Sequence, residues 1–166
     1  QKSDQPGHPT ADEALERVAL RRFGAELAPE VVKAWKQFSS AFREFPYHPG
    51  TLYNAPLHAG ASNPLWAQPT GYRATMVGIP YDDLNSWRMT YPPKVFIDQL
   101  EKVVRGFEAG IEPLTALLQS ADAKKIPAEY RKALSREIDV ARASAIHFQS
   151  VANQARFVVA RDELAK

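Results

Sequence analysis

The sequence contains no cysteine, so the chain can form neither a disulfide nor a thiolate metal site. It also lacks any apolar run of the roughly 18–20 residues that a membrane-spanning helix needs. Its 21 basic and 19 acidic residues are scattered, without the basic block that is typical of nucleic-acid binding. We therefore expect neither a nucleic-acid partner nor a membrane partner.

The familiar signatures of catalysis and cofactor binding are also missing. There is no nucleophile elbow, phosphate-binding loop, dinucleotide fingerprint or HExxH pair. His48 and His58 stand ten residues apart, which is not the spacing of two ligands on one helix, and no third ligand is evident. We expect no cofactor and no metal site, and the catalytic residues stay unassigned.

Helical patterns fill both ends of the chain. Thr10 and Glu13 form the capping-box pattern that opens a first helix, and Gly24 is a typical C-terminal stop. A second helix is expected from Pro29 to Pro46, along an apolar stripe spaced by three and four residues. Both helices would precede a long stretch without a helical pattern.

The second half of the chain predicts two longer helices. One restarts at Pro93, and Pro113 is expected to kink or split it near Gly110. The other opens at Pro127 and, running to Lys166, would be roughly 60 Å long at 1.5 Å per residue. Because that length exceeds what so small a domain can cover, its end should break or pack on something outside this chain.

The fold class that these patterns indicate is all-α, a helical bundle or irregular helical array of about four main helices. Residues 1–9 are expected to form a disordered or extended tail, and residues 10–166 a single helical domain. The sequence starts at Gln1 without Met and ends inside a helical pattern, so we expect a piece of a longer protein.

The most informative stretch is the central segment, residues 46–93, which joins the second and third expected helices. It holds eight of the 13 prolines, five of the six tyrosines and two of the three tryptophans. Flexible linkers are poor in aromatic residues, and long ordered loops are usually functional. We therefore expect an ordered loop that caps the helices or carries the site, with a short strand or extended run at 71–80.

Asp82 and Asp83 are the obvious carboxylate pair of this segment. Adjacent side chains point in different directions, so we do not expect the two to act together as acid and base. The simpler role is a helix cap, with Asp82 capping the short helix that follows it. A direct catalytic or ligand contact is the alternative.

An arginine follows an aromatic residue twice in the segment, at Tyr72-Arg73 and at Trp87-Arg88. Such rings and guanidinium groups recognise sugars and carboxylates by stacking and by forked hydrogen bonds. In the structural alternative, these arginines pair with the neighbouring aspartates and hold the segment to itself. Trp66 likewise would either plug the core or stack on a ligand, and the sequence leaves these alternatives open.

The stretch from Val32 to Pro93 resembles a region that follows the barrel in large, poorly characterised bacterial proteins of glycoside-hydrolase type. The resemblance lies in AWKQFSSAFREFPYHPGTLYNAP, then in NPLWAQPTGYRATMVGIPYDDLNSWR and YPP. A loosely similar arrangement, with a mostly helical domain after a barrel, occurs in α-glucuronidase-like enzymes. The resemblance implies a carbohydrate-processing context, with the catalytic carboxylates on a neighbouring barrel.

The residues that match this pattern form our candidate ligand-binding set, to which the loop histidine His58 is added. At Ile79 and Met89 this sequence differs from the residues that are usual in the pattern, so the substrate stays unassigned. The matching residues are Tyr53, Asn54, Asn63, Trp66, Tyr72, Arg73, Asp82, Asp83, Trp87 and Arg88.

On these grounds the chain is expected to be an accessory helical domain of a bacterial carbohydrate-active protein. Its aromatic loop would line or brace the substrate cleft of a neighbouring catalytic barrel, in a periplasmic or secreted protein rather than a cytoplasmic one. One alternative is a purely structural or homodimerising domain without a ligand. Another is a self-contained hydrolase that uses the histidines and aspartates of the central segment.

Overall fold

The computed structural model describes residues 9–165, which contain helices and loops but no strand. The expected all-α fold is confirmed, while the predicted tail lies outside the described residues except for Pro9. The described residues 71–80 form no strand, and the predicted extended run is interrupted by a turn at 76–78. The helices are α1 (Ala11–Phe42), α2 (Pro49–Asn54), α3 (Leu84–Arg88), α4 (Pro93–Gln119) and α5 (Ala128–Leu164), with 3-10 turns at Gly60–Ser62 and Ala121–Lys125.

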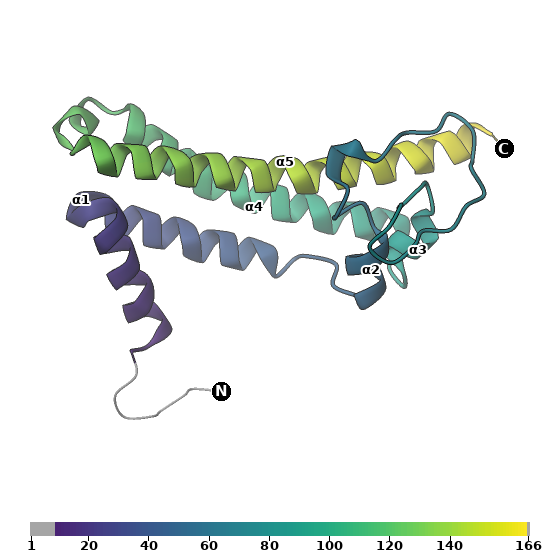
Figure 1. The fold of residues 1–166 in the computed structure, drawn as a ribbon, viewed down its shortest axis with the longest axis horizontal. Helices are drawn as coiled ribbons and strands as arrows, with labels where there is room; N and C mark the ends of the chain where they lie inside the picture. The colour runs from purple at the N-terminus through teal and green to yellow at the C-terminus, as the bar shows by residue number, and fades with distance from the viewer. Residues whose placement is uncertain (1–8, 166) are drawn as a thin grey trace.

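α1 has two arms that meet at an elbow. The predicted capping box opens it, since the Thr10 hydroxyl accepts a hydrogen bond from the Glu13 N–H and the Glu13 carboxylate accepts one from the Thr10 N–H. At Gly24 the backbone leaves the helical conformation with a φ of +76°, so the first helical arm ends there, as predicted, and the second arm of α1 continues in another direction. Figure 1 shows the first arm leaving the long axis of the molecule at this point.

The body of the molecule is a hairpin of α4 and α5 with the second arm of α1 packed along it (Figure 1). Apolar side chains of these helices form two buried clusters. One is built around Phe23, Val31, Leu114 and Leu134. The other is built around Trp87, Phe96, Leu100 and Val151, so the central segment shares a core with the helices.

α4 runs without a break through Pro113, so the predicted split near Gly110 is wrong. Pro113 itself is exposed, which leaves its ring on the solvent side of the helix. The buried side chains of Ile111 and Leu114, on either side of it, hold the helix against its neighbours despite the missing backbone donor.

The long α5 helix runs unbroken to Leu164, so the predicted break does not occur. The central segment folds back along it, as the loop beside the C-terminal end in Figure 1 shows. The segment reaches Arg161 on this helix, whereas Leu164 beyond it is 90% exposed, so the prediction that the end packs on something outside this chain stays a prediction. None of the helices within residues 9–165 combines the length and the apolar character needed to cross a lipid bilayer.

Candidate functional site

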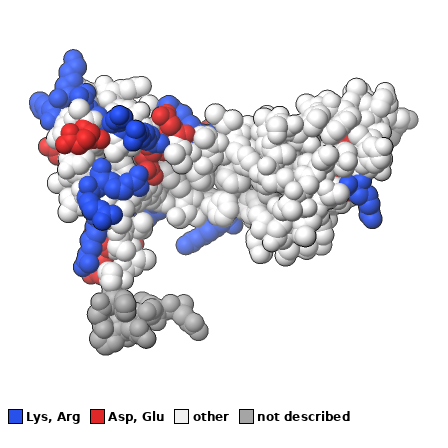
Figure 2. All heavy atoms as spheres, in the orientation of Figure 1, with Lys and Arg blue, Asp and Glu red and all other residues white. Residues whose placement is uncertain are grey.

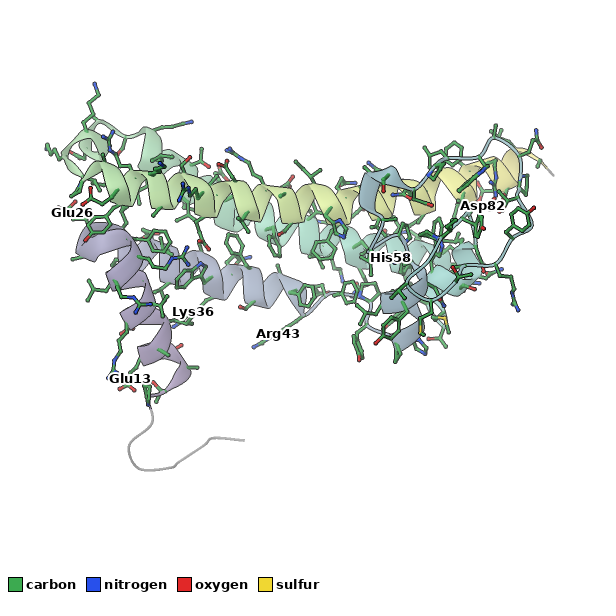
Figure 3. The ribbon with its side chains drawn as sticks, in the orientation of Figure 1. Glu13, Glu26, Lys36, Arg43, His58 and Asp82 are labelled. Carbon is green, nitrogen blue, oxygen red and sulfur yellow. The ribbon has the colours of Figure 1, made fainter. Side chains whose placement is uncertain are left out.

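A buried ion pair ties the central segment to the C-terminal part of α5. Arg161 Nη1 donates to Asp82 Oδ2 (2.6 Å) and to the carbonyl oxygen of Trp66 (3.1 Å). Thr70 donates to the same carboxylate through its hydroxyl and its backbone N–H. The side chains of Arg161 and Asp82 are only 9% and 7% exposed. The pair thus fixes two stretches of the segment against one helix, with Asp82 at the position labelled in Figure 3.

The charges of this pair are stable at neutral pH. Burial acts to raise the pKa of the Asp82 carboxyl, but hydrogen bonds from Thr70 and Arg161 outweigh it and lower that pKa below its ordinary value. Burial also works against the charge of Arg161, yet Asp162 and Asp82 together raise the pKa of its guanidinium. Asp82 is therefore a structural anion and not a proton donor.

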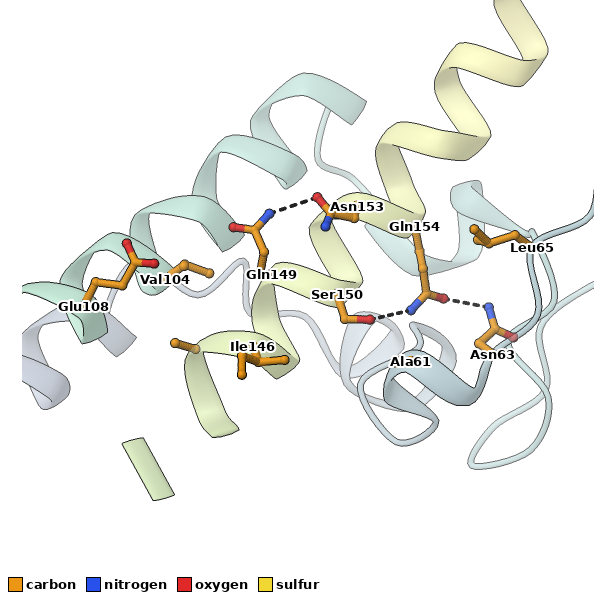
Figure 4. Close-up of a pocket in the computed structure, with 11 residues that line it drawn as sticks. Ala61, Asn63, Leu65, Val104, Glu108, Ile146, Gln149, Ser150, Asn153 and Gln154 are labelled. Carbon is orange, nitrogen blue, oxygen red and sulfur yellow. Dashed lines mark hydrogen bonds between the residues drawn. The ribbon is translucent and has the colours of Figure 1, made fainter. Parts of the chain in front are cut away.

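A second tie is a buried network of amides between the segment and α5 (Figure 4). Asn63 Nδ2 donates to Gln154 Oε1 and to the Tyr81 carbonyl oxygen, each at 2.9 Å. Gln154 Nε2 donates in turn to the carbonyl oxygen of Gly60 (2.9 Å) and to the Ser150 hydroxyl (3.2 Å). Because an unpaired buried amide is costly, this network favours one register of the loop on the helix.

Beside this network lies a shallow hollow of about 450 Å³ between α4, α5 and the segment (Figure 4). Its apolar part comes from Leu65, Val104 and Ile146, and Gln149 contributes an amide to its rim. Among the described residues that line it, Glu108 is the one ionisable side chain. A single carboxylate does not make an acid–base pair, so the hollow shows no catalytic arrangement.

Asp83, and not Asp82, caps the short helix α3. Its Oδ1 accepts a hydrogen bond from the Ser86 N–H (3.2 Å), and its Oδ2 accepts from the Ser86 hydroxyl (2.6 Å) and the Ala74 N–H (3.0 Å). The predicted cap is wrong by one position because the Asp82 carboxylate is taken by Arg161, which is far away in sequence.

The Trp87 ring fills the core beneath the segment and does not face a ligand. It is fully buried, and its Nε1 donates to the carbonyl oxygen of Pro80 (2.9 Å). Arg88 donates to the Tyr91 carbonyl oxygen (2.7 Å) and to Asn85 Oδ1 (2.6 Å), so it does not pair with the aspartates as the structural alternative predicted. The Trp87 ring is thus closed off from solvent, whereas Arg88 keeps a buried Nε without a hydrogen-bond partner among the described residues.

The remaining candidates divide between inner and outer positions. Trp66 is half-buried, and its ring lies 6.0 Å from that of Tyr81. The Tyr72 ring lies 5.2 Å from that of Tyr81, and Tyr72 is 66% exposed. Arg73 is exposed, and no residue in the described range 9–165 pairs with its guanidinium. Tyr72 and Arg73 are therefore the adjacent candidates that face solvent.

The half-buried Asn54 ends α2, next to the exposed Tyr53.

The histidines and aspartates of the segment are not brought together. His48 Nδ1 accepts from the Gly50 N–H (3.0 Å) and caps α2, and His58 Nε2 lies 2.5 Å from the Gly78 carbonyl oxygen. Among the described residues, no hydrogen bond joins either histidine to either aspartate, and no three His, Asp or Glu side chains are grouped to hold a metal ion. The paired base and nucleophile of a self-contained hydrolase are not assembled here.

The segment exposes many of its large apolar side chains. Eight of these side chains are strongly exposed: Tyr47, Leu52, Tyr53, Leu65, Tyr72, Met76, Val77 and Ile79. We call these eight residues the apolar surface. Only four of the 48 residues in the segment are charged, against 36 of the other 118. On the face drawn in Figure 2, this end of the molecule is correspondingly almost free of charged side chains.

Sequence reasoning missed both the apolar surface and Arg161. The apolar surface could have been predicted from the scarcity of charged residues between positions 46 and 93. Nothing in the helical pattern of α5 distinguishes Arg161 from its other arginines, because its role depends on where the loop returns in space.

Comparison of the chain with protein-family models, with curated proteins and with solved structures finds no match.

Proposed function

We propose that this chain is an accessory helical domain that braces a neighbouring catalytic domain of the same protein through its apolar surface. The observation that supports this best is the contrast between the two sides of the central segment. Its inner side is fixed by a buried ion pair and a buried amide network. Its outer side is apolar and almost uncharged, although charged residues make up 24% of the whole chain.

This contrast is typical of an interface. The cores of protein–protein interfaces are depleted of charged residues and enriched in Tyr, Trp and Met. Large exposed apolar patches on soluble proteins mark interaction sites. A loop that is already ordered before docking also loses less conformational entropy when it binds.

Bracing is favoured over lining a substrate cleft, because most of the candidate polar groups point inward. Asn63, Asp82 and Asp83 hold the segment together, and Arg88 hydrogen-bonds to nearby backbone and side-chain oxygens. The sequence resemblance to a region behind a glycoside-hydrolase-type barrel supports a carbohydrate-processing neighbour. In this proposal the neighbour carries the catalytic carboxylates, and this chain by itself hydrolyses nothing.

The test compares amide hydrogen exchange of residues 46–93 in the 166-residue chain with that in the product of the whole gene. We expect exchange near the apolar surface to be at least about tenfold slower in the whole product. Leu65→Glu should reduce this protection, whereas Val140→Glu, a similar change at an exposed site on α5, should not. Equal exchange in both proteins, or a gene without a neighbouring domain, contradicts the proposal.

A second candidate function is direct contact with sugar, and one observation favours it. Tyr72 presents an exposed ring supported by Tyr81, and Arg73 beside it has no partner within residues 9–165. Titrating the chain with uronic acids and oligosaccharides distinguishes the two functions. Bracing predicts no binding by the chain alone. Binding that Tyr72→Ala removes would favour sugar contact instead.

A further inference from the structure

The first arm of α1, residues 11–23, is joined to the second arm, residues 25–42, by a hinge at a single residue. Among the residues of α1, all of which the structure describes, Gly24 alone leaves the helical conformation, with a φ of +76°. Helix continues directly on both sides of it. Short hinges favour the exchange of an identical element between two copies of a chain, so this connection suits such an exchange.

The contacts of the first arm define the site on which it packs. Ala19 and Phe23 are fully buried in the cluster that the arm shares with α4 and α5. The Phe23 ring lies 5.9 Å from the ring of Trp35 on the second arm. Arg22 Nη2 pairs with Glu137 Oε2 on α5 at 3.3 Å. A second copy of the chain carries the same site, with the same apolar and charged groups.

The bend can open without disturbing either arm. If Gly24 takes the helical φ, α1 becomes one continuous helix of 32 residues, roughly 48 Å long at 1.5 Å per residue. Pro29 adds no cost to this change, because it already lies inside the helix in the bent form. A straight α1 withdraws Ala19 and Phe23 from their own core. Their exposure is unfavourable unless the same core of a second copy receives them.

A second observation concerns the elbow, where an apolar hollow is open to solvent. This elbow hollow has a volume of about 420 Å³ and is lined by residues of both arms: Glu16, Leu20, Ala25, Ala28, Pro29 and Val32. Leu20, one turn before the hinge, is 53% exposed. Because the hinge is so short, two chains that exchange their first arms must bring their elbows together. The elbow hollow would then be covered by the second copy.

We infer that two copies of this chain exchange their first arms about Gly24, so that each arm packs on the other copy with the contacts that it makes here. The structure itself therefore supplies both the site and its occupant. The inference goes beyond the proposed function and concerns the elbow, which lies at the opposite end of the molecule from the central segment (Figure 1). Because association costs translational freedom, the exchanged dimer depends on protein concentration.

A pair of charge reversals tests whether an arm and the site beneath it belong to different copies. Arg22→Glu and Glu137→Arg each place two like charges where the ion pair stands. The two variants are unfolded, mixed and refolded together. An exchanged dimer of the two variants brings the reversed positions together at one site and the native residues together at the other. Both sites then attract, whereas a chain that keeps its own arm keeps its own repulsion.

The fraction of dimer is measured by size-exclusion chromatography with light scattering at high protein concentration. It should be at least about threefold higher in the mixture than in either variant alone. Lys94→Glu and Asp98→Arg reverse an ion pair within α4, so mixing these two control variants should have no effect. The native chain should form the dimer in a fraction that rises with concentration. A native chain without dimer, or equal fractions in the mixture and in the single variants, overturns the inference.

A hinge variant tests the inference independently of the charge reversals, which also remove the Glu137 acceptor of Trp35. Gly24→Ala hinders the bent form, since the added Cβ would lie 2.6 Å from the Tyr130 ring. Ala also favours a helical hinge, so the association constant of the dimer should rise at least about fivefold over the native chain. Gly71→Ala, at a similar φ of +70° in open space, should leave it unchanged. An unchanged constant for Gly24→Ala, or an equal rise for both variants, overturns the role of the hinge.

A dimer that forms through the apolar surface is the rival to arm exchange. Leu65→Glu changes that surface and leaves the elbow intact, so arm exchange predicts the same fraction of dimer as in the native chain. A dimer that Leu65→Glu removes overturns the inference. The bracing role is decided separately, by the hydrogen exchange of the central segment in the product of the whole gene.

Discussion

Asp82 and Arg161 lie 79 positions apart in the sequence, and their side chains form an ion pair of 2.6 Å from which water is largely excluded. One belongs to the central segment and the other to the last turns of α5. Because Arg161 also donates to the Trp66 carbonyl oxygen, the pair closes the loop on the helix at two points. This contact makes the central segment part of the folded domain.

Removing the carboxylate of this pair should destabilise the chain strongly. Asp82→Asn leaves the Arg161 guanidinium buried with fewer partners, and we expect a loss of about 3 kcal/mol in the free energy of unfolding. Asp98→Asn is the control, because Asp98 pairs with Lys94 at an exposed i,i+4 site, where about 0.5 kcal/mol or less is expected. Urea unfolding measures both, and similar losses would contradict the structural role of the pair.

The same carboxylate should make stability depend on pH in acid. The pKa of Asp82 is lowered in the folded chain, so between its folded pKa and its unfolded value of about 3.9 the unfolded chain binds more protons. Its contribution is therefore complete above about pH 4 and is lost as the pH falls through the folded pKa. Arg161 stays protonated throughout this window, because its pKa is raised.

The exposed carboxyls of Glu13 and Glu44 also have lowered pKa values and act in the same direction. Asp82→Asn isolates the buried group from them. Unfolding free energies of the native chain and the variant should converge as the pH falls from about 5 to below 3. A constant difference across this range would show that Asp82 does not titrate differently in the folded and unfolded chain.

The amide network predicts a large effect at Gln154 and a small one nearby. Gln154→Ala leaves the Asn63 amide and the Gly60 carbonyl oxygen without this partner in a buried site, which should cost about 2–4 kcal/mol. Gln149→Ala removes an amide of the same type from the same helix, one that bonds only to the exposed Asn153, and should cost about 0.5 kcal/mol. Thermal unfolding of both variants gives the comparison, and equal midpoints would contradict the network.

The elbow of α1 predicts a second matched pair of variants. Gly24 has a φ of +76°, and an added Cβ would lie 2.6 Å from the Tyr130 ring, so Gly24→Ala should cost about 3 kcal/mol or more. Gly71 has a similar φ of +70° but open space around it, so Gly71→Ala should cost about 1 kcal/mol. Chemical denaturation of both separates the clash from the backbone strain, and an equal cost would remove the clash from the account.

Local patterns in the sequence predicted the helices well. The capping box at Thr10 and Glu13 depends on residues three apart, and it forms as expected. The first helical arm ends at Gly24, the predicted residue, but the spacing of residues does not predict the direction in which the second arm continues. Local rules therefore place the ends of helices and leave the direction of the chain after them open.

Predictions for the central segment depended on contacts that sequence spacing does not reveal. The adjacent aspartates are alike in sequence, yet Asp82 meets Arg161 and Asp83 caps α3. Trp66 and Trp87 both belong to the same aromatic-rich segment, and nothing in the sequence tells them apart. In the structure, Trp87 is the one that fills the core. These differences arise from the path of the loop along α5, which no local pattern encodes.

The central claim is that residues 46–93 are ordered before any partner binds, and amide hydrogen exchange of the 166-residue chain tests it most directly. The N–H groups of Thr70, Ala74 and Val77 each donate to an acceptor within the segment. We predict exchange at least about a hundredfold slower than in an unstructured chain at all three. Exchange at the unstructured rate would show a mobile loop and would contradict the bracing role.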